Sequence, residues 1–336
     1  MNEIIRIGVD TSKSVFQVHG VDAAERPVLC KRLRRSEVER FFAALAPTVI
    51  GLEACGAAHH WARVLEGLGH QARLIPPQYV KPYVKRGKND AADAAAICEA
   101  MSRPSMHFVP VKTAENQAAL MLHGARDLLL KQRTMLTNAI RGHAAEFGLT
   151  GAKGSCQIAA LLERIAAANV PALAREIFAR LAEQIEALNV QMDSLDAQLR
   201  AWHRTNERSR RLAAIPGVGV IGATALAMKV PDPGFFKSGR HFAAWLGLTP
   251  KDHSTAGRQR LGGITRAGDE TVRRLLVSGA LAVIQRAKPG RSSPWLLGLL
   301  ARKPKKLAAV ALANKTARIA WALMSRGETY QRPATA

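Results

Sequence analysis

A long run of regularly spaced apolar residues in the middle of the chain restricts its fold more than any other feature. These residues advance by three and four positions in strict alternation: Phe178, Leu181, Ile185, Leu188, Met192, Leu195, Leu199 and Trp202. A sustained period of about 3.5 residues is typical of a helix that packs along a coiled-coil seam. The partner is either a helix of the same chain, as in a helical hairpin, or a second copy. We therefore predict an α-helical coiled-coil region over residues 109–205.

The first 108 residues alternate between strand and helix patterns. Strand-like apolar runs occupy residues 4–9, 15–18, 28–32, 49–53 and 72–75, and helix patterns occupy residues 37–45, 61–68 and a stretch from about 90. Only a turn separates the first two runs, so they predict a β-hairpin. Alternating strands and helices predict an α/β domain over residues 1–108 with a mostly parallel sheet.

Beyond residue 205 the pattern changes to short helices with turns that contain Gly and Pro. We predict a mainly α C-terminal domain over residues 206–330. The segment I-P-G-V-G at residues 215–219 has the form of a helix-hairpin-helix, in which Gly217 and Gly219 would let backbone N–H groups approach a phosphate. A plain tight turn between helices is the alternative, and the arginines nearby favour DNA contact.

The charge of the chain points to a polyanionic partner. With 49 Lys and Arg against 26 Asp and Glu, the formal net charge is +23, and residues 237–336 carry 19 basic against 4 acidic residues, a balance of +15. Clustered positive charge is typical of phosphate binding, and a highly charged surface without a specific partner is the alternative.

Lys and Arg interrupt every long apolar stretch and the N-terminus has no secretory leader, so we expect neither a membrane span nor secretion. Four widely spaced cysteines disfavour a zinc site and fit a reducing cytoplasm.

Four acidic residues of the first domain form a candidate metal site. Asp10 ends the first strand in G-V-D, and Glu53 ends a later strand in G-L-E. Asp90 and Asp93 share one face of a helix start through their i, i+3 spacing. Sites assemble at the carboxyl ends of strands, and clustered carboxylates require a hard cation such as Mg²⁺ or Mn²⁺, which promotes phosphoryl transfer. Taken singly, Asp10 or Asp90 is as readily a capping residue, whereas Glu53 ends an apolar run and should be paired or metal-bound.

A serine followed by arginines is the second candidate site. Ser254 lies on a polar, Gly-rich loop, and Arg258, Arg260 and Arg266 follow it. A serine among guanidinium groups can attack a phosphodiester while the cations stabilise the developing charge. The consecutive residues Asp252, His253 and Ser254 cannot form a hydrolase relay, because its members come from separate elements. On residue type alone, Ser254 is more often a loop or capping serine.

Taken together, and in the same order, these segments resemble the transposases of insertion-sequence family 110, the DEDD transposases regarded as bridge-RNA-guided recombinases. The segments G-V-D-T-S-K, G-L-E-A-C-G and K-N-D-A-A-D-A resemble the RuvC-like domain with its four acids. The segments I-P-G-V-G, F-A-A-W-L-G-L-T-P and S-T-A-G-R-Q-R-L-G-G resemble the C-terminal transposase domain. The form H-S-T-A-G-R-Q-R is similar to the subgroup of insertion sequence 1111. The resemblance covers nearly the whole chain.

The resemblance implies a fold, a cofactor and partners. Four acids would bind Mg²⁺ in an RNase H-like (RuvC-like) fold, namely Asp10, Glu53, Asp90 and Asp93. Ser254 would be the nucleophile that forms a phosphoserine link to DNA, with Thr255 as a minor alternative. A noncoding guide RNA would pair with donor and target DNA. The protein would act as a homo-oligomer, a dimer or tetramer, whose RuvC-like and transposase domains meet in a composite site, in the bacterial cytoplasm at the nucleoid.

Other functions compete with this leading hypothesis. The second hypothesis is a RuvC-like metal-dependent nuclease on branched DNA, with water as nucleophile and Ser254 structural. The third is a basic architectural protein that would tolerate replacement of Asp10 or Glu53. A strand followed by D-x-x-K also opens actin-like ATP-binding kinases, but those need a second Gly-rich phosphate loop, which this sequence lacks.

Overall fold

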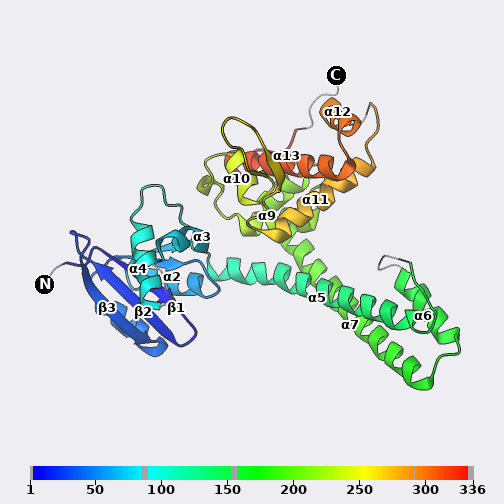
Figure 1. Ribbon diagram of the computed structural model, residues 1–336, viewed down its shortest axis with the longest axis horizontal. Helices are drawn as coiled ribbons and strands as arrows, with labels where there is room; N and C mark the ends of the chain where they lie inside the picture. The colour runs from blue at the N-terminus through cyan, green and yellow to red at the C-terminus, as the bar shows by residue number, and fades with distance from the viewer. Residues whose placement is uncertain (1–2, 85–89, 153, 155–156, 291, 332–336) are drawn as a thin grey trace. The chain divides into compact units, whose positions relative to one another are not determined.

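The computed structural model describes residues 3–84, 90–152, 154, 157–290 and 292–331 (Figure 1). The chain forms two compact units, Met1–Gln117 and Ala118–Ala336. The predicted division into three domains, with boundaries at residues 108 and 205, stays a prediction. Within the described residues, no helix combines the length and apolar character that crossing a bilayer requires.

The first unit is built on a five-stranded sheet. Its strands are β1 (Arg6–Thr11), β2 (Val15–Val21), β3 (Pro27–Arg34), β4 (Val49–Glu53) and β5 (Gln71–Ile75), in the order β3-β2-β1-β4-β5. The predicted opening hairpin is confirmed, because β1 pairs antiparallel with β2. The prediction of a mostly parallel sheet is wrong: β2 and β3 are also antiparallel, and only the β1–β4 and β4–β5 pairs are parallel. Short turns join the first three strands, and a parallel pair needs a much longer crossover.

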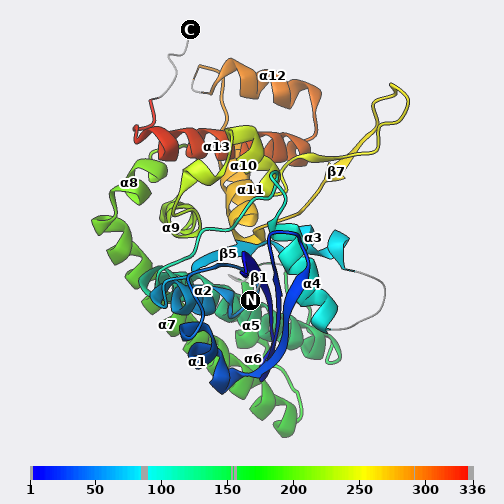
Figure 2. The same ribbon diagram turned by 90° about the vertical axis from the view of Figure 1, so that its left-hand side faces the viewer.

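Helices cover both faces of this sheet. Helices α1 (Val38–Ala43) and α2 (Ala58–Gly67) share a core with the β1 residues Ile7 and Val9. Helix α4 (Asp90–Met101) covers the opposite face (Figure 2). Short helical turns, α3 (Pro77–Val80) and a 3-10 segment (Lys81–Tyr83), follow β5. Strand residues therefore alternate between two covered faces, as the period of two dictates.

Long helices open the second unit. Helix α5 (Ala114–Ala145), whose first turn belongs to the first unit, precedes α6 (Ile158–Ala167) and α7 (Ala172–Thr205). Arg126 of α5 pairs with Asp196 of α7 at 2.5 Å, and the Arg133 guanidinium donates to Asn189 at 2.9 Å. The later contact residue of α5, Arg133, meets the earlier contact residue of α7, Asn189, so α5 and α7 run antiparallel.

The regularly spaced apolar residues of α7 are its buried face. Phe178, Ile185, Met192 and Leu199 are all at most 6% exposed. Phe178 and Ile185 belong to one core with Ile140 of α5 and with α6. A partner for the seam therefore exists within the chain, while a coiled coil with a second copy stays a prediction.

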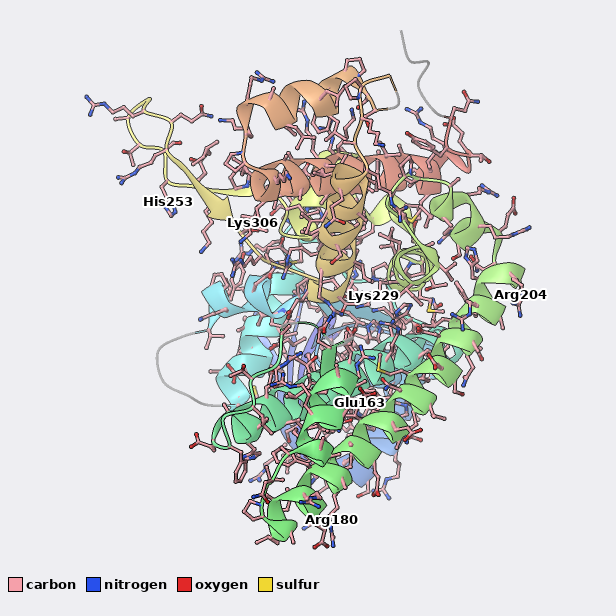
Figure 3. All side chains as sticks on the ribbon, turned by 90° about the vertical axis from the view of Figure 1, so that its right-hand side faces the viewer. Glu163, Arg180, Arg204, Lys229, His253 and Lys306 are labelled. Atoms are coloured by element: carbon pink, nitrogen blue, oxygen red, sulfur yellow. The ribbon has the colours of Figure 1, made fainter. Side chains whose placement is uncertain are left out.

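The rest of the second unit is mainly helical, as expected. Its helices are α8 (Glu207–Ala213), α9 (Val220–Lys229), a 3-10 turn (Pro233–Phe235), α10 (Gly239–Trp245), α11 (Glu270–Gln285), α12 (Pro294–Arg302) and α13 (Lys305–Arg326). A row of fully buried alanines on α13 packs in a common core with α9 and α11. Strands β6 (Pro250–Asp252) and β7 (Leu261–Ile264) form a hairpin that projects from these helices, with His253 labelled on it in Figure 3.

Candidate functional site: an acidic cluster and a serine hairpin

Parallel pairing places two of the four acids side by side. Val9 of β1 pairs with Leu52 of β4, so the next residues, Asp10 and Glu53, end adjacent strands at the same edge of the sheet. Asp90 is the first residue of α4, and Asp93 follows within its first turn. Carboxylate oxygens of Asp10, Asp90 and Asp93 all lie within 4.8 Å of one another. The structure thus brings together three of the predicted ligands, with Glu53 on the neighbouring strand.

Two glycines make this convergence possible. Gly8 and Gly51 pair across β1 and β4, and each precedes its acid by two residues, so glycine and acid share the face that α4 covers. A Cβ at Gly8 would lie 2.2 Å from the Ala94 carbonyl oxygen, and one at Gly51 would lie 2.9 Å from the Met101 sulfur. Gly8, which faces the backbone of α4, therefore lets this helix approach the sheet closely enough to bring its first turn to Asp10, and Gly51 leaves room for the Met101 side chain.

The acids of the cluster repel one another. The pKa of Asp10 is raised to about 6, first because the side chain is partly buried and then because Asp93, Asp90 and Glu53 repel its charge. Burial, followed by repulsion from Asp93, also raises the pKa of Glu53. A divalent cation with oxygen ligands would relieve this repulsion, so the donor set fits such an ion. The clustered carboxylates Asp10, Asp90 and Asp93 are the residues that could hold it.

The second candidate site is the tip of the β6–β7 hairpin. Ala256 and Gly257 have φ values of 47° and 77°, and Thr255 and Arg258 exchange backbone hydrogen bonds around them. Two central residues with positive φ form the kind of turn that closes a twisted hairpin. Ser254 directly precedes this turn and is exposed.

Hydrogen bonds fix the Ser254 side chain. Its Oγ accepts a hydrogen bond from the Arg260 amide at 2.9 Å, and its own amide donates to Asp252 Oδ1 at 2.9 Å. Hydrogen bonds from the Ser254 hydroxyl and amide hold the pKa of Asp252 below its usual range. The sequence argument missed Asp252 as a partner of the serine. The D-x-S spacing of an Asx turn was the available signal.

The predicted arginines separate into two groups. Arg258 and Arg260 lie beside Ser254 at the hairpin tip, whereas Arg266 follows β7 at the base of the hairpin. His253 donates its amide to the Arg260 carbonyl at 2.9 Å, and within the described chain no hydrogen bond joins its ring to Ser254. The geometry therefore agrees with rejecting an Asp-His-Ser relay.

The two glycines of the predicted helix-hairpin-helix have different surroundings. Both lie between α8 and α9, and a Cβ at Gly217 would lie 2.8 Å from the Gly279 carbonyl oxygen of α11. No atom of the described residues lies within 4 Å of a Cβ built on Gly219, which is the N-cap of α9. Gly217 thus serves packing against α11, and Gly219 is the glycine with free space beside it. Phosphate contact at either stays a prediction.

Comparison with known proteins assigns the family. A family model described as "Transposase IS116/IS110/IS902 family" matches residues 209–295, and a DEDD transposase model of the same group matches residues 7–147. The transposase y4pF/y4sB of Sinorhizobium fredii is 61% identical over 99% of this chain and 87% of its own length.

Two further relatives indicate the subgroup. The transposase for IS1111A of Coxiella burnetii is 39% identical over 98% of this chain and 92% of its own length. The transposase for IS1328 of Yersinia enterocolitica is 38% identical over 99% of this chain and 100% of its own length. The DEDD family implies dependence on a divalent metal, in agreement with the acidic cluster. The chain therefore belongs to the IS110/IS116/IS902 family of transposases, in the IS1111-like subgroup, and is a DNA transposase.

Proposed function

We propose that the chain is a Mg²⁺-dependent DNA recombinase that cleaves and exchanges strands through Ser254, guided by an RNA encoded in its element. The observation that carries the proposal is the meeting of the Asp10, Asp90 and Asp93 carboxylates within 4.8 Å. A mixed sheet whose adjacent parallel strands end in Asp10 and Glu53 supports an RNase H-like (RuvC-like) fold for the first unit. Membership of a transposase family makes DNA the substrate.

Mg²⁺ would be held by Asp10, Asp90 and Asp93, with Glu53 beside them. When bound, the ion supplies positive charge to a phosphodiester, and Mn²⁺ can supply the same chemistry. The chain's own contribution is to bring the carboxylates together, which α4 does by docking on Gly8 and Gly51. Among the described residues no salt bridge pairs these acids, and clustered carboxylates are costly to a fold unless a ligand uses them.

Ser254 would attack the phosphorus of a DNA phosphodiester. Its Oγ forms a new P–O bond, the bond to one deoxyribose oxygen breaks, and that oxygen leaves as a hydroxyl after gaining a proton. Asp252, which accepts the hydrogen bond of the serine hydroxyl, is placed to take the proton of the nucleophile. Arg258 and Arg260 would stabilise the charge that develops on the phosphoryl oxygens.

Further parts of the proposal rest on the family resemblance. A noncoding guide RNA pairs with donor and target DNA, the protein acts as a homo-oligomer, and it works in the bacterial cytoplasm at the nucleoid. A net charge of +23 supports binding of nucleic acid through its backbone, which leaves sequence reading to base pairing.

A metal-dependent nuclease with a structural serine is the second candidate function. The hydrogen bonds of Ser254 to Arg260 and Asp252 favour it, because a loop-holding serine makes the same contacts. Thr255 sits next to Ser254 in the turn and provides a matched control for its removal.

The deciding experiment starts from protein expressed with its native flanking DNA, whose bound RNA is sequenced. The purified complex is incubated with donor and target DNA and Mg²⁺ and analysed on a denaturing gel. A protein–DNA adduct that is lost in Ser254→Ala, retained in Thr255→Ala and lost in Asp10→Asn supports the recombinase. Free DNA ends that persist in Ser254→Ala would establish the nuclease instead.

A further inference from the structure

A broad groove crosses the second unit beside helices α12 and α13. It has a volume of about 1570 Å³, above the range of about 300–1,000 Å³ that is usual for small-molecule pockets. One wall is formed by α12 and α13, and the other by the start of α10 and the base of the β6–β7 hairpin. Its size suits a polymer that passes through the groove, which we name the α12–α13 groove. Lys306 marks its position in Figure 3, at the start of α13.

Every charged residue that lines the α12–α13 groove is positive. The lining includes six exposed basic side chains and neither Asp nor Glu: Arg240, Arg266, Lys303, Lys306, Lys315 and Arg318. Among the described residues, none of the six has a carboxylate within salt-bridge distance. Six unneutralised cations around one groove are complementary to a chain of phosphates.

The wall formed by α12 and α13 also carries exposed apolar and aromatic side chains. Trp295 is 41% exposed and Leu307 is 53% exposed, and both line the groove. The Lys315 ammonium lies 4.2 Å from the centre of the Trp295 ring, so a cation and an aromatic face are presented together. Helix α13 buries a face of small alanines and turns Leu307, Val310 and their neighbours toward the groove.

We propose that the α12–α13 groove binds a single strand of DNA, with phosphates on the basic walls and at least one base stacked on Trp295. A duplex presents phosphates on its outside and keeps its bases stacked, so an exposed tryptophan in the groove would have no base to stack on. Single-strand binding sites combine a positive groove with aromatic side chains in this way.

Family membership favours DNA over RNA as the occupant, because the chain is a DNA transposase. Recognition of RNA uses hydrogen bonds to the ribose 2′-hydroxyl, so a comparison of oligo-dT with oligo-rU distinguishes the two occupants.

Continuity with the serine hairpin gives this strand a role. Pro250, Gly262 and Gly263 belong both to the β6–β7 hairpin and to the lining of the groove. A strand in the groove would therefore run along the base of the hairpin whose tip carries Ser254. Assigning that strand as a DNA strand undergoing exchange rests on the proposed function, whereas binding of a single strand by the groove does not.

The test measures binding of fluorescently labelled oligonucleotides by the full chain, freed of RNA and kept in EDTA so that no cleavage occurs. The probes are oligo-dT and oligo-rU of about 12 nucleotides, within the site size of single-strand binding modules, and a DNA duplex of the same length. Lys306→Gln removes a lining cation, and Lys305→Gln is its matched control, because Lys305 is exposed on the same turn outside the lining. Trp295→Leu removes the aromatic face, and Trp295→Phe restores a ring.

We expect oligo-dT to bind more tightly than oligo-rU or duplex. Trp295→Leu should weaken oligo-dT binding about 5- to 150-fold, the range for one lost base–aromatic stack, and Trp295→Phe should recover most of it. Lys306→Gln should reduce the steepness of log K against log salt by about 0.7, and Lys305→Gln should leave it unchanged.

Three results would overturn the inference. The first is that Lys305→Gln and Lys306→Gln change the salt dependence of oligo-dT binding equally. The second is that Trp295→Leu binds oligo-dT as tightly as the wild type. The third is that the protein prefers oligo-rU or duplex and that Trp295→Leu and Lys306→Gln remove this preference. Ser254→Ala should bind oligo-dT like the wild type, because Ser254 lies outside the groove lining. The two proposals can therefore fail separately: oligo-dT binding can prove independent of the groove while the DNA adduct still forms, or the groove can bind oligo-dT while no adduct forms.

Discussion

Replacing Asp10 by Asn should stabilise the metal-free protein while removing a ligand of the proposed metal site. The Asp10 pKa is raised from 3.8 to about 6, and each unit corresponds to about 1.36 kcal/mol, so the ionised carboxylate costs the fold about 3 kcal/mol. Asp10 is only partly buried, and solvent screening reduces this cost to about 1–2 kcal/mol. Asn keeps the shape of the side chain and removes the charge.

The sign of this effect depends on pH. Because the folded-state pKa lies above the unfolded value, both states are protonated below about pH 3.8 and Asp10 then costs the fold nothing. The cost grows as the pH rises toward 6 and is complete above it. Asp10→Asn should therefore be about 1–2 kcal/mol more stable than the wild type at pH 8, with the difference shrinking toward pH 4.

Amide hydrogen exchange of β1 and β4 in EDTA measures this difference within the first unit alone. Asp22→Asn is the control with the opposite sign, since hydrogen bonds from Arg26 and Ala24 lower the pKa of Asp22. That variant should lose protection at pH 8. Adding Mg²⁺ should then protect the wild type and leave Asp10→Asn unchanged. The electrostatic reasoning is refuted if Asp10→Asn protects the amides of β1 and β4 no better than the wild type at pH 8. It is also refuted if the difference in protection between the two proteins is the same at every pH.

Three other predictions follow from the two sites. Affinity for Mg²⁺ should fall up to about tenfold per pH unit below pH 6, as protons compete for Asp10, and isothermal titration across pH 5–8 measures it. Gly8→Ala places a Cβ against the Ala94 carbonyl and should cost about 3 kcal/mol by urea unfolding, with loss of metal binding; full metal affinity would contradict the docking argument. Asp252→Asn keeps the turn but weakens the proton acceptor of Ser254, so adduct formation should slow to a similar extent at every pH near neutrality, where Asp252 stays ionised, with unchanged DNA binding.

The sequence was sufficient to predict most of the secondary structure of the first unit and where its acidic residues gather. Strand and helix periodicities are local signals, so the hairpin, the later strands and the helix that begins at Asp90 were all predicted. The convergence of Asp10 and Glu53 was predictable as well, because adjacent parallel strands end at the same edge of a sheet. The antiparallel direction of β3 was not predicted, because the prediction of a mostly parallel sheet overlooked how short the turn between β2 and β3 is.

Sequence alone determined the helical spacing of α7, the ends of the acid-bearing strands and the strong positive charge of the last hundred residues, because each depends on neighbours along the chain. Only the tertiary structure decided which helix covers the α7 seam and how closely Gly8 lets α4 approach the sheet. It also gathered Arg240, Trp295 and Lys315 around one groove. These properties depend on distances between residues far apart in sequence, which are set by packing rather than by local pattern.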